Sequence, residues 1–359
     1  MNELRVTVQP GTGYDLLMSA ALLANPEASR RLDATRAVRQ RGEAIGDGSL
    51  VEVFERIGRE PFLNLLGFVN AMTEEPTAEN ALAAIAAADP LELHLTIAGY
   101  YRRAFRITTP PTVIRAAIGG DESAIAEFKR TSYPHVGHWQ GSLRNMLGRS
   151  HEDVHAELAG ALRQWLVAGF TALEPEIEAR LAADVAVVRP QLADADLDTM
   201  LLRLVPGITF ARELGNDLVV LTPSVLVKPG FALADYGTTM VIVYPAAGHI
   251  EGSDKPPDRL VRLTKAMGDE LRLRALRELR DGPMVATELA KRLGVPRTTI
   301  HHHVSILINA GLVRMAVDDA RTGNIQLRPE AVAELTELAQ AWLLGRVQST
   351  DGRERVEES

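Results

Sequence analysis

The sequence predicts an α+β protein, mainly α: a large N-terminal helical domain with a small antiparallel β-meander, followed by a smaller helix-rich domain. Three observations carry this prediction. Apolar residues recur at helical spacing over most of residues 14–198, β-branched runs appear between residues 208 and 244, and a series of short helices starts after residue 257.

The overall composition is that of an ordinary folded protein. A chain of 359 residues with 46% hydrophobic and 24% charged residues suits two domains. The absence of cysteine excludes disulfides, thiolate catalysis and cysteine-ligated zinc, and fits a reducing compartment. The sequence shows neither a leader pattern nor a run of about 18 apolar residues. We therefore expect a cytoplasmic protein that does not contact membranes.

The first domain is expected to span residues 1–250. Leu4–Val8 alternates like a short strand, and the runs Leu218–Thr222 and Met240–Tyr244 are separated by turn residues, which favours a meander. No motif in these residues identifies a particular ligand. We expect it to serve as an effector or assembly domain of unknown function.

Glycine and proline mark the boundary between the two domains. Gly248, Gly252 and the pair Pro256–Pro257 lie within a dozen residues and suit an exposed connection. The second domain is expected at residues 257–346, and the short, highly charged segment 347–359 is expected to be a disordered tail.

Charge is distributed unevenly along the chain. The net charge is −8, but residues 255–328 contain 14 Lys and Arg against 8 Asp and Glu, so this segment is +6 and the remainder −14. Because phosphate binding depends on locally clustered cations, the segment remains compatible with a nucleic-acid partner.

The second domain has the pattern of a helix-turn-helix. Helices are predicted near residues 260–267, 271–279, 288–293 and 297–310. In the last of these, Ile300, Val304 and Leu307 form an apolar stripe and Gly311 supplies a left-handed cap. A second helix that is apolar on one face and rich in hydrogen-bond donors on the other suits the major groove of DNA.

A hairpin and a final helix are predicted to follow. Residues 312–317 and 324–328 read as strands on either side of a polar tip, so residues 312–328 are expected to form a wing. Pro329 opens a helix whose apolar stripe, formed by Val332, Leu335, Leu338 and Trp342, needs a partner surface.

Four motifs in this order resemble ArsR-type winged helix-turn-helix regulators; they are Asp269–Leu276, Thr287–Gly294, Thr298–Val304 and Ala310–Val313. The preceding part is similar to an uncharacterised domain found in some bacterial regulators of this type. The resemblance implies a homodimer built on the first and last module helices, a palindromic operator in double-stranded DNA, and repression relieved by a signal. The paired cysteines and the His and acidic ligands of the family's metal sensors are missing, so metal sensing through those sites is not expected.

The candidate DNA-binding residues lie on the exposed face of the helix 297–310 and at the wing tip. They are Arg297, Thr298, Thr299, His301, His302 and Arg321. Arg297 could form two hydrogen bonds to a guanine, and Arg321 at the wing tip could enter the minor groove or bind a phosphate. The alternative for each is a solvated surface side chain. His303 is expected to make a structural hydrogen bond, and because successive helical residues point about 100° apart the three histidines do not converge on a metal.

A zinc-dependent hydrolase with an accessory winged helix is the alternative function. His151–Glu152–x–x–His155 has the spacing that places two imidazoles on one zinc, with Glu174, Glu176 or Glu178 as a third ligand. Against this, Ser150 and Asp153 read as a helix cap, which puts the pair in a first turn. We therefore expect no enzyme activity, no cofactor and no metal.

Two further motifs point only weakly to a ligand. Gly11–Thr–Gly13 follows a strand, but Leu16 stands where a dinucleotide loop needs glycine. The segment Gly99–Phe105 mixes aromatic residues with arginines and could line a pocket for an unknown small-molecule effector, or be an ordinary helix with buried aromatics. Trp139 and Trp165 read as core residues.

Overall fold

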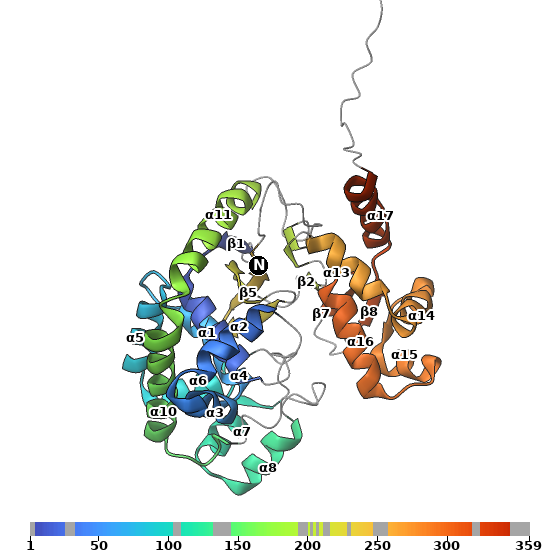
Figure 1. Ribbon diagram of the computed structural model, residues 1–359. Helices are drawn as coiled ribbons and strands as arrows, with labels where there is room; N and C mark the ends of the chain where they lie inside the picture. Colours follow the sequence, from blue (N-terminus) through green and yellow to red (C-terminus); the bar gives the residue numbers. More distant parts are fainter. Residues whose placement is uncertain are drawn as a thin grey trace, which may run out of the picture. The chain divides into compact units, whose positions relative to one another are not determined.

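The computed structural model describes residues 4–25, 33–102, 109–131, 145–192, 200–201, 204–205, 208–210, 216–227, 231–246, 258–317 and 324–344. The chain divides into two compact units, Met1–His249 with Val317–Thr322, and Ile250–Ala316 with Gly323–Ser359. The protein is mostly helical with small sheets, as predicted (Figure 1). Within the described ranges, no helix is long and apolar enough to cross a membrane.

A mixed four-stranded sheet forms the centre of the first unit, which we call the body. Its strands, in spatial order, are β1 (Arg5–Val8), β3 (Leu218–Ser224), β5 (Thr239–Pro245) and β4 (Ala232–Tyr236). β1 and β5 each pair parallel with β3, and only β4 pairs antiparallel, with β5. The predicted antiparallel meander is therefore wrong.

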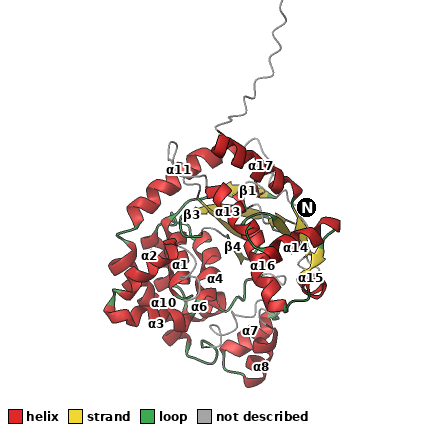
Figure 2. Cartoon of the chain, turned by 45° about the vertical axis from the view of Figure 1, so that its right-hand side comes forward, coloured by secondary structure: helices red, strands yellow, loops and turns green. Residues whose placement is uncertain are grey.

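The reason for this error is that the sheet is buried on both faces. Alternate residues of β3 and β5 belong to two different hydrophobic clusters, with Val220 and Val241 on one face and Leu221 and Ile242 on the other. A strand covered on both faces is apolar throughout, which is typical of parallel strands. Figure 2 shows the strands between α11 and the group containing α1 and α4.

Helices cover the sheet on both faces, and most of the described part of residues 14–198 is helical, as its apolar spacing predicts. The elements that contribute to the body are α1 (Thr12–Leu23), α2 (Asp33–Glu43), η2 (Gly46–Gly48), α3 (Ser49–Ile57), α4 (Arg59–Asn70), α5 (Ala78–Ala87), α6 (Pro90–Ile97), α10 (His151–Trp165), the π-helical η3 (Leu166–Phe170), α11 (Glu174–Leu192) and the short strand β2 (Ile208–Phe210). A satellite cluster packs α7 (Pro111–Ile118) and α8 (Glu122–Thr131) against α6.

A buried aspartate ties α1 to the carboxyl end of β3. Asp15 is fully buried, and its Oδ1 accepts hydrogen bonds from Ser224 Oγ at 2.7 Å and from the backbone N–H groups of Val225 at 3.1 Å and Leu226 at 3.2 Å. Burial raises the pKa of Asp15 to about 7, although these hydrogen bonds act in the opposite direction. The contact links residues that lie about 210 positions apart.

The second unit contains the predicted helices and hairpin in the predicted order. Its elements are α13 (Asp258–Met267), α14 (Glu270–Glu278), η5 (Leu279–Asp281), β6 (Met284–Val285), α15 (Ala286–Leu293), α16 (Arg297–Asn309), β7 (Val313–Val317), β8 (Asn324–Leu327) and α17 (Pro329–Leu344). β7 and β8 pair antiparallel, and β6, which the sequence did not predict, pairs with the other edge of β8.

Candidate nucleic-acid interface

Helix α16 begins after a tight turn that fixes its direction. Gly294 ends α15 at φ +67°, a left-handed conformation that glycine adopts without strain, and Pro296 precedes the first helical residue. Ile300, Val304 and Leu307 are buried, as predicted, and Gly311 follows the helix at φ +64°. The apolar stripe therefore anchors α16 on the unit and leaves its other face outward.

The outward face of α16 carries the candidate DNA-binding residues. Arg297, Thr298 and His302 are exposed, whereas Thr299 and His301 are half-buried. Arg297 Nε donates a hydrogen bond to His301 Nε2 at 3.2 Å, one helical turn further on. The guanidinium of Arg297 is thus held along the helix surface by a neutral acceptor.

His303 lies on the inner flank of the helix. Its Nδ1 is 3.5 Å from Asp269 Oδ1, a distance that is too long for a good hydrogen bond. Asp269 is the N-cap of α14 and accepts a hydrogen bond from the backbone N–H of Arg272 at 2.9 Å; this bond is the main reason that the pKa of Asp269 is lowered. His303 therefore lies beside this cap, but the structural hydrogen bond expected for it is not found at its buried Nδ1 within the described residues.

The hairpin that follows the helix-turn-helix in the chain carries a further arginine, Arg314. Arg314 on β7 pairs with Gln326 on β8 in the sheet register, and Arg314 Nε donates to Gln326 Oε1 at 2.8 Å. Neither residue was predicted as a candidate, although the alternation of polar Arg314 and Gln326 with apolar Val313 and Ile325, which are buried, can be seen in the sequence. Arg321, the predicted wing-tip residue, lies outside the described residues.

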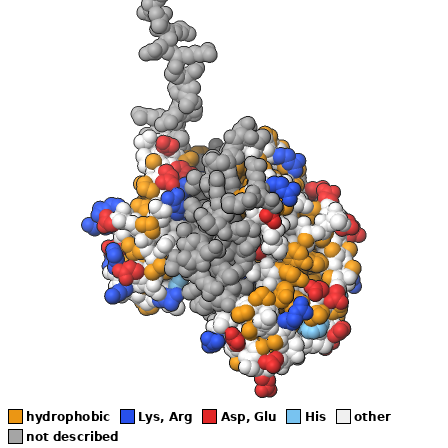
Figure 3. Space-filling view, turned by 180° about the vertical axis from the view of Figure 1, so that it is seen from behind, with side chains coloured by type: hydrophobic (Ala, Val, Ile, Leu, Met, Phe, Trp, Pro, Cys, Tyr) orange, Lys and Arg blue, Asp and Glu red, His pale blue; other side chains and the backbone are white. Residues whose placement is uncertain are grey.

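Most other arginines with a visible partner in this unit pair with carboxylates. The pairs are Arg259–Glu334, Arg272–Asp269, Arg280–Asp281, Arg292–Glu278, Arg292–Glu288 and Arg328–Glu330. Arg328 is also buried and donates to the carbonyl oxygen of Gly311 at 2.6 Å, which gives it a structural role. Figure 3 accordingly shows the Lys and Arg side chains of this unit interspersed with acidic ones.

Helices α13 and α17 lie against each other and leave apolar side chains exposed. Arg259 of α13 donates to both carboxylate oxygens of Glu334 on α17, at 2.7 and 2.6 Å. Val332 is 40%, Trp342 38% and Leu343 73% exposed along α17. The described part of the unit therefore leaves part of the predicted apolar stripe uncovered.

The H-E-x-x-H motif does not form a convergent ligand set. Ser150 caps α10 by accepting from the backbone N–H of Asp153, as predicted. His151 Nδ1 lies 2.9 Å from Nδ1 of buried His94, while His155 Nε2 lies 3.1 Å from the carbonyl oxygen of Ile85. Among the residues that can be described, no group of three or more His, Asp or Glu side chains is arranged to hold a metal ion.

The aromatic and arginine-rich segment of the body is only partly described. Tyr101 donates to Glu92 at 2.6 Å and packs against Tyr236, while Arg102 forms a buried ion pair with Glu60 at 2.9 Å. These partners tie the segment to the rest of the body. Arg103, Phe105 and Trp139 lie outside the described residues, and Trp165 is fully buried, as expected of a core residue.

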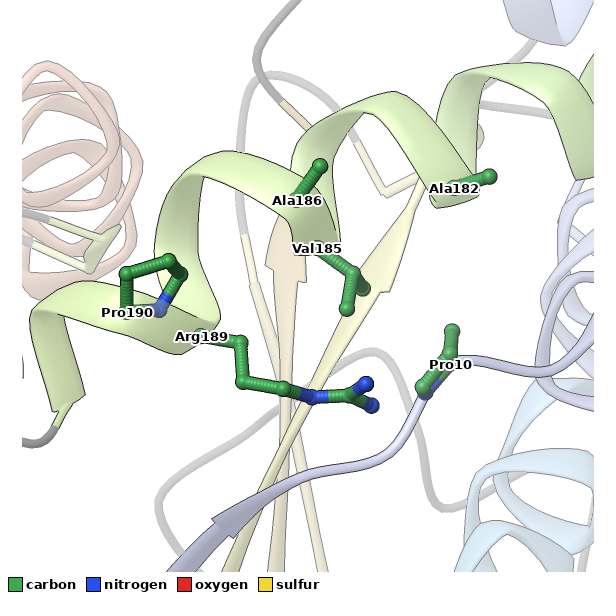
Figure 4. Close-up of a pocket in the computed structure, with 6 residues that line it drawn as sticks. All are labelled: Pro10, Ala182, Val185, Ala186, Arg189 and Pro190. Atoms are coloured by element: carbon green, nitrogen blue, oxygen red, sulfur yellow. The ribbon is translucent and has the colours of Figure 1, made fainter.

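A groove in the body lies between α11 and the segment that follows β1. It is lined by Pro10 and by one side of α11, namely Ala182, Val185, Ala186, Arg189 and Pro190 (Figure 4). Arg189 supplies its only charged side chain, and the Nη2 of this residue already lies 3.4 Å from the carbonyl oxygen of Val8. The lining offers no set of converging polar groups that would select a ligand.

Comparison with known families confirms the helix-turn-helix. A family model described as a helix-turn-helix domain matches residues 267–316, which include α14, α15 and α16. No curated protein and no solved structure matches the chain. The helix-turn-helix domain indicates a DNA-binding regulator.

Proposed function

We propose that the protein is a sequence-specific transcriptional regulator that binds double-stranded DNA through α16 and the hairpin of residues 312–328. The observation that carries the proposal is the polar outward face of α16 within a matched helix-turn-helix domain. A helix with this face can enter the major groove with its N-terminal residues at the base edges.

The proposed contacts follow the exposed face from its N-terminal end. Arg297, Thr298 and Thr299 stand in the first turn, and His301 and His302 in the second. Arginine with two free terminal nitrogens forms two parallel hydrogen bonds to guanine O6 and N7, a contact that discriminates against other bases by about 1–3 kcal/mol. Arg321 is proposed to contact the minor groove from the wing.

A homodimer on a palindromic operator is part of the proposal. The exposed Val332, Trp342 and Leu343 of α17 offer an apolar surface for a second copy of the chain. In such a dimer, two α16 helices reach half-sites about one turn of DNA apart, roughly 34 Å. The proposal also includes repression, which the resemblance to ArsR-type regulators implies, and a body that serves as an effector or assembly domain.

Catalysis is not part of the proposed function. The imidazoles of His151 and His155 point to different neighbours, so no observation favours the zinc hydrolase. Measuring the zinc content of the purified protein tests this. We expect less than one zinc per chain in the native protein and the same content in His155→Ala.

Selection from a random duplex library tests the proposed function. The full-length protein is expected to enrich an inverted repeat, and the triple variant Arg297→Ala, His301→Ala, His302→Ala is expected to lose it. Arg280→Ala, which removes an exposed arginine already paired with Asp281, is the control and should enrich the same repeat. If the native protein enriches no sequence and shows no salt-dependent DNA binding, the module makes protein contacts instead and the proposal fails.

A further inference from the structure

In the described part of the C-terminal unit, Arg297 and Arg314 each donate a hydrogen bond to an uncharged side chain. Arg297 Nε donates to His301 Nε2, and Arg314 Nε donates to Gln326 Oε1. A ring nitrogen that accepts a hydrogen bond belongs to a neutral imidazole, and a side-chain amide carries no charge. These partners hold the guanidinium groups without neutralising their positive charge, and no carboxylate among the described residues forms an ion pair with either arginine. The carboxylate partners of Arg280 and Arg292, by contrast, do neutralise their charge.

The hairpin fixes where Arg314 is presented. Side chains alternate across a strand, so the buried Val313 and Ile325 face the core of the unit while Arg314 and Gln326 share the outer face. The two residues are directly opposite in the register, and their side chains span the two strands at 2.8 Å. Arg314 therefore lies flat on the outer face of the hairpin and does not extend freely into solvent.

The geometry also determines which atoms of Arg314 remain available. A guanidinium has five N–H donors in a planar fork, and Gln326 occupies the one on Nε. Within the part of the chain that the structure describes, Nη1 and Nη2 have no hydrogen-bond partner and no carboxylate forms an ion pair with them. Two adjacent N–H donors on a held, charged fork match two oxygens of a phosphodiester.

We propose that Arg314 binds a backbone phosphate of DNA and that Gln326 is the residue that positions it. The inference rests on the proposed function and adds to it a phosphate contact from the strand of the hairpin, apart from the tip. Arg314 follows the buried Val313 at the start of β7, far from the hairpin tip, so its side chain cannot extend deep into a groove of DNA. A phosphate on the DNA surface therefore fits this position better than the edge of a nucleobase. Such a contact adds affinity for any duplex sequence and is sensitive to salt.

Gln326→Glu separates charge from structure. Glutamate has the length of glutamine and keeps an oxygen for Arg314 Nε, but it adds a negative charge that neutralises the guanidinium. One lost phosphate contact lowers the slope of log K against log salt by about 0.9. The affinity ratio of native protein to variant therefore shrinks by about 3-fold when salt rises from 50 to 200 mM.

The test measures DNA binding by fluorescence anisotropy at several salt concentrations for the full-length native protein, Gln326→Glu, Arg314→Ala and the double variant. Both single variants are expected to lose the same slope, the double variant to lose no more than either, and all to retain the native base preference. Gln164→Glu, the same change at an exposed position of the body, should leave the slope unchanged. Thermal unfolding checks that Gln326→Glu is folded.

Two results overturn the inference and are distinguishable. If the native protein binds DNA with salt dependence but both single variants keep its slope, Arg314 does not contact a phosphate while the proposed function stands. If the native protein does not bind DNA in a salt-dependent way, both the inference and the proposed function fall.

Discussion

Asp15→Asn changes how the stability of the body depends on pH. The carboxyl of Asp15 is fully buried, and burial raises its pKa from 3.8 to about 7. Between these two values, unfolding releases a proton, since the unfolded chain ionises Asp15 while the folded chain keeps it protonated. Because the folded pKa is the higher one, stability is lost as the pH rises through this window. Asparagine cannot ionise, so the variant lacks this loss.

The size of the effect follows from the pKa shift. One pKa unit corresponds to about 1.4 kcal/mol, so a shift from 3.8 to about 7 makes ionisation in the folded state cost about 4 kcal/mol. Most of this cost appears between pH 5 and 8. Over that range, the free energy of unfolding of the native chain should fall by about 2–3 kcal/mol more than that of Asp15→Asn.

Urea unfolding at pH 5, 6, 7 and 8 measures this difference. Trp165 is buried in the body, and as the sole tryptophan, in a background with Trp139→Phe and Trp342→Phe, it reports on this unit alone. Asp153→Asn, at an exposed position of α10, is the control and should follow the native pH profile. Parallel profiles for Asp15→Asn and the native chain would refute the reasoning.

Three further substitutions test the packing of the body. Burial lowers the pKa of His94 from 6.5 to about 4, so this residue contributes stability above about pH 6.5 that is lost as the pH falls, the opposite of the effect of Asp15. The free energy of unfolding of the native chain should fall by about 2 kcal/mol more between pH 7 and 5 than that of His94→Gln, which urea unfolding at each pH measures. Glu60→Ala should destabilise by about 3–5 kcal/mol, because it removes the carboxylate paired with Arg102 where both side chains are buried. Gly67→Ala should destabilise by about 1–3 kcal/mol, since an added Cβ would lie 2.9 Å from Tyr236 Cβ.

Matched controls show whether these effects arise from burial. His302→Gln, on the exposed face of α16, should not alter the pH profile of the body. Glu176→Ala, in an exposed pair with Arg180, should cost less than about 1 kcal/mol. Gly160→Ala, whose Cβ would meet nothing within 4 Å inside a helix, should stabilise by about 0.5–1 kcal/mol. Equal effects in a test variant and its control would contradict the account.

Features that depend on neighbours in the sequence could be predicted. The caps Ser150 and Asp269 and the left-handed Gly311 are visible as local patterns, and each is found where expected. The burial of Ile300 and Leu307 follows from helical spacing alone. These signals sufficed to place the helix-turn-helix.

Features that depend on distant pairing could not be predicted. Arg5 of β1 lies beside Leu218 of β3, more than 200 residues away, and the apolar runs in β3 and β5 do not reveal which strands they join. β6 has two residues, too few for a pattern. The Arg314–Gln326 contact depends on the register of the hairpin, which is set by how β7 and β8 pair.

Mapping the position of α16 on DNA tests the central claim most directly. The chain has no cysteine, so Ser305→Cys on the outward face of α16 can carry a single DNA-cleaving iron chelate. Thr264→Cys on α13 is the matched control, since both hydroxyls are exposed and bond to the carbonyl oxygen four residues back. We expect major-groove cleavage from position 305 at two half-sites about one helical turn apart, and none in that groove from position 264. Equal cleavage from both positions, or none from position 305 on bound DNA, would contradict the assignment of α16 as the recognition helix.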